Sequence, residues 1–235
     1  MTELLHMKDN YIKECDAEVL VSAENYIVLD RSCFYPEGGG QPSDKGFLIW
    51  EGRKIEVSRV AKEKGIVKHY VSEVIPVGSL VHCHLDWDRR YKHMRMHSAE
   101  HLLSAIVLDN YGAEVAGNQI GTERSRVDFK PFKPDRHMLE DIVNRFNRAV
   151  DEAREIRIEM TTREDMIRRV DERRRRMFER LPSFIKDVRL VVIDGYDIDP
   201  CAGTHVRNTK EIGHINIIKT ENKGADTTRL IFTLE

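Results

Sequence analysis

The chain is poor in cysteine and aromatic residues, and it has no long apolar run. It holds four cysteines in 235 residues, and 7% of its side chains are aromatic. No apolar stretch approaches the ~18 residues that a membrane-spanning helix needs, so we expect no membrane partner. The cysteines are not spaced as a disulfide framework, and no signal peptide is evident. We therefore expect a reducing, cytoplasmic setting, where a cysteine near histidines is more typical of a metal site than of a disulfide.

Charge of one sign is not in excess either, since the net charge is −2. An apolar fraction of 40% is sufficient for a core and argues against disorder. The basic residues are nevertheless clustered, around Arg89, Arg90 and Arg95 and again in the arginine run 173–176. A single arginine most often lies on a solvated face. Two such clusters near candidate site elements predict a surface that contacts phosphates.

The sequence changes character near residue 90. Short β-like runs precede it, at 19–29, 47–50, 54–60, 66–71 and 80–85, and predict a small β-barrel or sandwich over residues 1–90. Helical periodicity follows it, at 97–112, 135–150 and 163–180. Strand-like runs lie between and after these helices, at 124–129, 155–160, 188–193, 212–220 and 227–234. Strict βαβ alternation is missing, so we expect an α+β domain over residues 91–235.

Two short motifs at opposite ends of the predicted α+β domain carry residues that bind metals. His97 and His101 are spaced i and i+4, which on a helix places both imidazoles on one face with Cβ atoms about 6 Å apart. Cys201 and His205 have the same spacing, in a segment whose proline and glycine predict a turn or loop. Together they form a Cys-His₃ set, whose softness and ligand types suit zinc.

Each motif alone is weak evidence. Either spacing arises often by chance. In that alternative, His97 and His101 are ordinary helix residues and Cys201 is a small buried hydrophobe. A metal site that closes the domain explains why the motifs lie at its two ends. A zinc peptidase is a further alternative, because residues 97–101 match H-x-x-E-H with Glu100 as general base. That class uses a carboxylate as third ligand, whereas this chain offers Cys201 and His205.

The motifs, in their order, resemble a known family. Residues 97–103 (H-S-A-E-H-L-L), 125–129 (S-R-V-D-F) and 200–206 (P-C-A-G-T-H-V) resemble the editing domain of alanyl-tRNA synthetase. Residues 34–46 (F-Y-P-E-G-G-G-Q-P-S-D-K-G) resemble the glycine motif of the β-barrel that precedes that domain. Because no aminoacylation region accompanies them, the pattern is similar to the AlaX family of free-standing trans-editing proteins, in the class that keeps the barrel.

This resemblance implies a translation-factor-like barrel, followed by an α+β editing domain like those of alanyl- and threonyl-tRNA synthetases. It implies that Zn²⁺ is held by His97, His101, Cys201 and His205. The implied activity is hydrolysis of tRNA(Ala) mischarged with serine, or with glycine as a second candidate, to free amino acid and tRNA. A non-catalytic tRNA-binding module with a structural zinc is the alternative.

Two positions depart from the family pattern. Ala202 stands where the synthetase usually has glycine, and Glu100 stands where the family has a small or neutral residue. Glu100 is either an acid/base contributor or an exposed helix residue, and we favour the second. Four protein ligands also make a closed site of the structural type. We therefore expect either that His205 or Cys201 is displaced, or that the ion anchors the substrate's amino group.

Three groups of residues are candidates for contacting the substrate. In the family a polar residue just after the zinc helix contacts the amino-acid side chain, and a pocket that binds the serine hydroxyl rejects alanine. Asn118, Gln119 and Thr122 are the candidates, with a polar turn as the alternative.

The second group is the glycine loop, where Gly38, Gly39, Gly40 and Gln41 are expected to approach phosphate or the tRNA terminus. A tight barrel turn is the alternative there. The third group is Arg89, Arg90 and Arg95, which we expect to bind phosphates of the acceptor stem, with an affinity that falls steeply with salt.

Overall fold

The first part of the computed structural model, which describes residues 2–170 and 186–235, is a small barrel. Six strands close in the order β2-β3-β7-β6-β5-β8. They are β2 Glu14–Ser22, β3 Tyr26–Leu29, β5 Gly46–Trp50, β6 Arg53–Glu63, β7 Ile66–Val71 and β8 Leu80–Leu85. Short segments beside it are β1 Glu3–Leu4, a 3₁₀ helix Leu5–Met7 and β4 Arg31–Ser32. The predicted small barrel is confirmed, and its likeness to translation-factor barrels stays a prediction.

One predicted strand is wrong. Residues 19–29 form β2 and β3, which pair antiparallel with Val19 opposite Leu29. Between them the Ala23 N–H donates to the carbonyl of Tyr26 at 2.9 Å, which closes a tight turn. The apolar alternation continues from β2 into β3, so the sequence pattern does not reveal the turn between them. Asn25 is a residue type that favours such a turn.

Strand alternation fills the barrel with apolar side chains. Along β8, Val81, Cys83 and Leu85 are buried, while His82 and His84 between them face outward and are partly exposed. The same alternation in the other strands builds a barrel core of its own, which includes Leu48, Ile55 and Val57.

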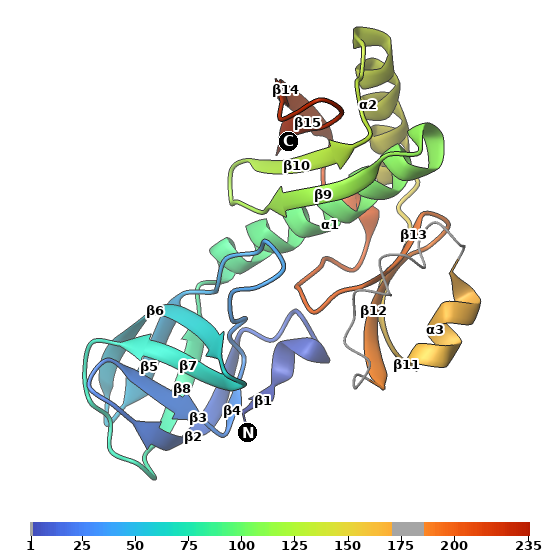
Figure 1. The fold of residues 1–235 in the computed structure, drawn as a ribbon. Coiled ribbons are helices and arrows are strands. Elements are labelled where there is room, and N and C mark those ends of the chain that lie inside the picture. Colours follow the sequence, from blue (N-terminus) through green and yellow to red (C-terminus); the bar gives the residue numbers. More distant parts are fainter. Residues whose placement is uncertain (1, 171–185) are drawn as a thin grey trace.

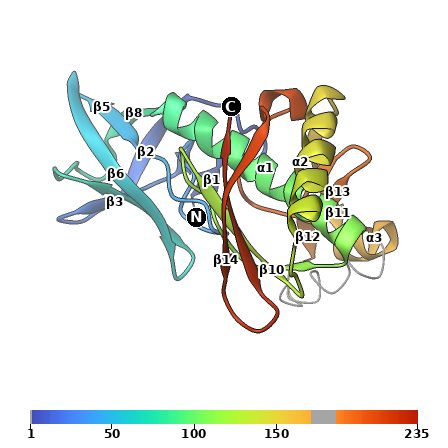
Figure 2. The ribbon, with the colours of Figure 1, turned by 90° about the horizontal axis from the view of Figure 1, so that it is seen from above.

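A long helix, α1 (Trp87–Tyr111), leads out of the barrel. It begins well before the predicted residue 97, because the Asp86 carboxylate caps it by accepting from the Arg89 N–H at 3.1 Å. Buried residues occur on most of its length, so it forms the centre of the second core rather than a surface helix. Figures 1 and 2 show the barrel at one end of α1 and the remaining sheets along the rest of the helix.

Two sheets flank α1, one on each side in Figure 1. The four-stranded sheet has the order β14-β15-β10-β9, with β9 Glu114–Gln119, β10 Ser125–Lys130, β14 Ile215–Asn222 and β15 Thr228–Leu234. The three-stranded sheet has the order β11-β12-β13, with β11 Ile156–Thr162, β12 Asp187–Ile193 and β13 Asp197–Pro200. Strands β9 and β13 were not expected from the sequence.

Helix α2 (Arg136–Asp151) confirms the predicted helix and its cap, since the Asp135 carboxylate accepts from the Met138 N–H at 2.8 Å. Helix α3 (Arg163–Arg169) and a 3₁₀ helix Thr209–Glu211 complete the part of the chain that the structure describes. The predicted continuous helix 163–180 is wrong, because α3 ends at Arg169 and Val170 has an extended backbone. The rest of that prediction, with the arginine run 173–176, lies outside the described ranges. The mixture of helices and strands agrees with the expected α+β class.

Two buried clusters lie on either side of residue 90, one in the barrel and one around α1. Buried polar contacts cross between them: Gln41 of the barrel loop reaches Thr204, and Arg90 of α1 reaches Asp44. The division into 1–90 and 91–235 therefore stays a prediction. Within the described ranges, no helix combines the length and apolar character needed to cross a membrane.

Candidate metal centre and cavity

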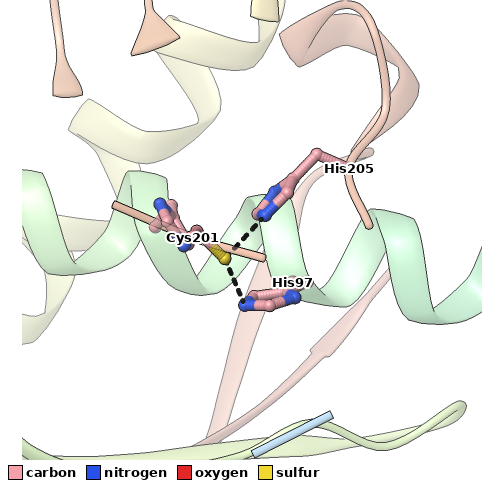
Figure 3. A group of neighbouring side chains, drawn as sticks. His97, Cys201 and His205 are labelled. Atoms are coloured by element: carbon pink, nitrogen blue, oxygen red, sulfur yellow. Dashed lines mark hydrogen bonds between the residues drawn. The ribbon is translucent and has the colours of Figure 1, made fainter. Parts of the chain in front are cut away.

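The structure brings the two distant motifs together. His97 and His101 project from α1, while Cys201 and His205 follow β13 in a segment without regular structure, and all four donor atoms lie within 4.8 Å of one another. The Cys201 Sγ atom lies 3.7 Å from Nε2 of His97 and 3.4 Å from Nε2 of His205, as Figure 3 shows. Tetrahedral ligands about 2.0–2.3 Å from a zinc ion are themselves about 3.3–3.8 Å apart. The group can therefore hold a metal ion.

Each of the three imidazoles has a separate partner at its other nitrogen. The contacts are His97 Nδ1 to Gln41 Oε1 at 2.8 Å, His101 Nδ1 to Asp197 Oδ2 at 3.2 Å, and His205 Nδ1 to Ser98 Oγ at 3.2 Å. A partner at Nδ1 fixes the ring and leaves Nε2 for an ion, which is the usual arrangement behind metal-binding histidines. The donor set and its partners thus both fit a metal site.

Gln41 has a different position from the one expected. It is buried, its Oε1 atom accepts from His97 and from the Thr204 N–H at 3.1 Å, and its Nε2 donates to the Thr204 hydroxyl at 2.9 Å. These bonds use the amide within the protein. We therefore take Gln41 out of the candidate tRNA contacts and assign it to orienting His97.

Gly203 is required by the packing of His97. A Cβ atom at position 203 would lie 2.1 Å from Cε1 of His97, so any larger residue displaces that ring. The Gly203 N–H also donates to the Cys201 sulfur at 3.2 Å. Ala202, in contrast, is exposed at the cavity, so its methyl group does not crowd His97.

Charge at the cluster favours a thiolate. Burial alone would raise the pKa of the Cys201 thiol, but His97 and His205 outweigh it and hold that pKa well below its ordinary value. Burial lowers the pKa of His205, with a further contribution from His97. Burial also acts to lower the pKa of His101, yet its hydrogen bonds to Asp197 and Cys201 raise that pKa well above its ordinary value. An anionic sulfur among imidazoles is the form in which cysteine binds metals.

A cavity of about 470 Å³ opens beside the cluster. His97, His101 and Cys201 form part of its wall, together with Gly38, Gly39 and Asn118. The volume lies within the range typical of small-molecule sites. The cluster thus borders a space that can admit a substrate.

Glu100 also lines this cavity. It is 5% exposed, and its Oε1 atom accepts from the Ser104 hydroxyl at 3.0 Å. The expectation of an exposed helix residue is therefore wrong. The helix turns Glu100 toward the cavity because positions 97, 100, 101 and 104 share one face.

The structure separates the three polar candidates after α1. Asn118 lines the cavity, whereas Gln119, its neighbour in β9, is exposed and accepts from Nε of Arg126 at 3.0 Å. Thr122 follows the strand and is not among the residues that line the cavity. Since neighbours in a strand face opposite sides, Asn118 reaches the cavity and Gln119 does not; Glu114 and Val115 of β9 line the cavity as well. The polar-turn alternative is wrong for residues 117–119.

The glycine loop forms the tight turn that was the alternative to binding. The Gly38 N–H donates to the Gln41 carbonyl at 3.1 Å, and the Gln41 N–H donates back at 2.9 Å. At Gly40 φ is 82°, and a Cβ atom would lie 2.0 Å from Oδ1 of Asn118. The loop's third glycine therefore lets Asn118 approach. Gly38 and Gly39 are exposed at the cavity and stay candidates for substrate contact.

The prediction that Arg90 contacts phosphate is wrong. Its side chain is fully buried, with Nε donating to the Asp44 carboxylate at 2.9 Å. Its other nitrogens donate to the carbonyls of Asn10 and Cys33, both at 2.8 Å. A guanidinium held in this way joins α1 to the barrel, so we remove Arg90 from the candidate RNA surface.

The neighbouring arginines differ in how far they are engaged. Arg95 donates from Nε to the Ile212 carbonyl at 2.9 Å and from Nη2 to the Glu235 carbonyl at 2.6 Å, which ties α1 to the end of the chain. Arg89 is partly exposed and makes a long bond of 3.4 Å to the Ser43 carbonyl. Of the three arginines, Arg89 keeps the most freedom to contact a phosphate.

Comparisons with known proteins agree with this arrangement. The family described as tRNA synthetases class II (A) matches residues 3–89, and the threonyl and alanyl tRNA synthetase second additional domain matches residues 188–231. The alanyl-tRNA editing protein AlaX-M of Methanosarcina acetivorans is 39% identical over 100% of this chain and 99% of its own length. That of Saccharolobus solfataricus is 37% identical over 100% of both chains.

A larger protein matches in part. The alanine–tRNA ligase of Pyrococcus furiosus is 36% identical over 98% of this chain, which spans 26% of the ligase. The match with the editing proteins extends over both whole chains at identities well above 30%. The chain belongs to the AlaX-M family of alanyl-tRNA editing proteins.

Proposed function

We propose that this protein hydrolyses the aminoacyl ester of tRNA(Ala) that carries the wrong amino acid, chiefly serine, with glycine as a second candidate. It is an aminoacyl-tRNA deacylase, and we expect it to act in the cytoplasm. The observation that carries the proposal is the Cys-His₃ cluster at the wall of a cavity of about 470 Å³. A site of this kind combines metal ligands with room for an aminoacylated ribose.

We propose zinc as the ion of this cluster. One thiolate and three imidazoles are the ligand types that zinc prefers, and zinc held there supplies Lewis-acid chemistry suited to an ester carbonyl. The protein prepares the site through Gln41, Ser98 and Asp197, which hold the three rings from behind. Because each of these partners is fixed in the folded protein, the three imidazoles are already oriented for an ion.

Two side chains in the cavity wall are proposed to act on the substrate. The Glu100 carboxylate, held at Oε1 by Ser104, is placed to accept a proton inside the cavity. The Asn118 amide is placed to hydrogen-bond the side-chain hydroxyl of serine. A bound alanine would leave that amide unpaired, which is the physical basis of discrimination. Gly38, Gly39 and Arg89 remain proposed contacts for the tRNA terminus and its phosphates.

The peptidase alternative gains no support from the geometry. An H-x-x-E-H peptidase needs a carboxylate as third ligand. The carboxylate of Asp197 faces Nδ1 of His101, and that of Asp199 lies 3.9 Å from Nε2 of His101 but is not among the four residues whose donor atoms converge. The remaining donors are the Cys201 sulfur and His205. Cleavage of a peptide that disappears in Glu100→Gln would nevertheless revive this alternative.

A deacylation assay tests the proposal. Ser-tRNA(Ala) is incubated with excess protein, and free serine is measured against Ala-tRNA(Ala), with and without chelator and after zinc is restored. We expect serine release that the chelator stops and zinc restores. As the control, His214→Gln replaces an exposed histidine that pairs with Asp151 at 2.8 Å and should behave as the unchanged protein. Binding of tRNA(Ala) without any serine release would instead identify a non-catalytic module.

A further inference from the structure

A second cluster of histidines and carboxylates lies on the outer face of the barrel. His82 and His84 of β8 flank Cys83, whose side chain is buried, so both imidazoles face outward. The antiparallel pairing of β2 with β8 places Glu14 opposite His84 and Asp16 opposite His82. Four polar side chains from two strands therefore share one patch.

Three of these side chains converge on one another. Glu14 Oε2 lies 3.3 Å from Nδ1 of His84 and 3.8 Å from Nε2 of His82. The two imidazole centroids are 4.5 Å apart, and one donor atom from each of the three residues lies within 4.8 Å of the others. Tetrahedral ligands about 2.0–2.2 Å from a common ion are about 3.3–3.6 Å apart, which is close to the two distances from Glu14.

Neighbouring side chains orient both rings. Asp16 Oδ1 lies 2.6 Å from Nδ1 of His82, which turns Nε2 of that ring toward Glu14. A carboxylate behind a histidine is the arrangement that supports metal ligands elsewhere in proteins. Phe47 of β5 stacks on His84 at 4.8 Å and 20°, so that ring has limited freedom to turn away.

We propose that Glu14, His82 and His84 form a second metal site, which takes a divalent transition-metal ion such as Zn²⁺, Ni²⁺ or Co²⁺. Two imidazoles and one carboxylate suit these ions, whereas Mg²⁺ and Ca²⁺ prefer oxygen ligands. Three protein ligands leave further positions to water. An ion there links β2 to β8, the contact through which the first strand of the barrel meets the last.

The plain alternative is a set of charge contacts on a solvated surface. The side chains of Glu14 and His82 are 61% and 37% exposed, and exposed ion pairs contribute little to stability. Such contacts would also bring the three donors together, but they would not bind an added metal. Metal binding therefore separates the two interpretations. It also does so independently of the proposed deacylation, because α1 and the segment after β13 take no part in the barrel cluster.

The test is a cobalt titration of the full chain, without a histidine tag and stripped of metal, in competition with a coloured chelator. A thiolate ligand gives cobalt a charge-transfer band in the near ultraviolet, and only the cluster around Cys201 contains a cysteine. We expect two equivalents of Co²⁺ to bind, one with that band and one without it. His82→Gln with His84→Gln should lose the second equivalent and keep the first. His214→Gln, a matched exposed histidine beside an aspartate, should keep both.

Asp16→Asn provides the finer test, because it retains all three ligands. Loss of the carboxylate behind His82 should weaken the second equivalent about 10- to 100-fold and leave the thiolate band unchanged. A single equivalent that carries the thiolate band in the unchanged protein would overturn the proposal, as would two equivalents in the His82/His84 double variant. Failure of the proposed function has a different signature, namely absent deacylation or an absent thiolate band, with the second equivalent still bound.

Discussion

The two histidine clusters of this protein differ most in what surrounds them. In the cluster around Cys201 the three histidines are no more than 4% exposed, and each ring has its own partner at Nδ1. In the barrel cluster Glu14 and His82 are partly in solvent, and a carboxylate supports His82 alone. The donor residues are similar, but the surroundings are not.

This difference teaches what a ligand set needs in order to perform chemistry. Burial removes competing water and strengthens electrostatic interactions, while partners behind the rings keep the donors in place. The buried cluster has both and borders a cavity, so we expect it to bind metal more tightly and to act on substrate. The barrel cluster faces bulk solvent, and we expect it to bind more weakly and to link strands.

The largest effect should come from Cys201→Ala. Loss of a direct ligand should reduce serine release by more than about 100-fold, because loss of a partner behind a ligand already costs about 10- to 100-fold. Single-turnover deacylation of Ser-tRNA(Ala) measures this. Cys15→Ala, which removes a cysteine beside the barrel cluster, is the control and should leave the rate unchanged. Equal rates in both variants would erase the proposed distinction between the two clusters.

A methyl group at position 203 should have nearly as large an effect. In Gly203→Ala the new Cβ would meet Cε1 of His97 at 2.1 Å, so the ring must move. Misplacement of a reacting group by 1 Å can cost about 100-fold in rate. The matched change Ala202→Gly lies one position away; it removes an exposed methyl group at the cavity wall without crowding His97, and should alter the rate little. If Gly203→Ala kept full activity, His97 would have to bind from a different position.

Removal of a partner from the buried cluster should have an intermediate effect. Gln41→Leu deprives His97 Nδ1 of its acceptor and should weaken zinc binding about 10- to 100-fold, measured by competition with a coloured chelator. Gln119→Leu removes a glutamine that lies outside the cavity and should leave the affinity unchanged. If Gln41→Leu costs as little as its control, the outer partners do not distinguish the buried cluster from the barrel one.

The convergence of the four candidate ligands was predictable from sequence because their signal is local. The spacing of His97 and His101 fixes a shared helix face, and the chemistry of Cys201 and His205 is explicit in their residue types. The partners behind them were not predictable. Gln41 approaches His97 from the barrel loop, and nothing in the spacing of amides and carboxylates indicates which of them will face a ring after folding.

The basic residues illustrate a different limit. Arg89 and Arg90 are adjacent and chemically alike, so their sequence predicts one role for both. On α1 they face different directions, and Arg90 meets the buried carboxylate of Asp44. That contact depends on how the barrel packs on the helix. Residue type alone therefore could not separate a structural arginine from a candidate phosphate contact.

Strand β9 shows why the pocket residues were only partly resolved. Gly117 and the polar residues after it favour a turn when read alone, but β10 supplies a pairing partner, with Asn118 opposite Val127. Once the segment is a strand, alternation separates Asn118 from Gln119. The sequence pointed to a segment that borders the cavity, and the fold decided that Asn118 rather than Gln119 faces it.

The smallest effect should come from Asn118→Ala, which tests the cavity wall rather than the metal ligands. Loss of one neutral hydrogen bond is worth about 1 kcal/mol, so the preference for Ser-tRNA(Ala) over Ala-tRNA(Ala) should fall about 5-fold, measured as a ratio of single-turnover rates. Gln119→Ala, on the opposite face of β9, should leave the ratio unchanged. A lowered ratio in Gln119→Ala alone would mean that substrate lies on the far side of β9. The cavity would then no longer distinguish the buried cluster from the one on the barrel.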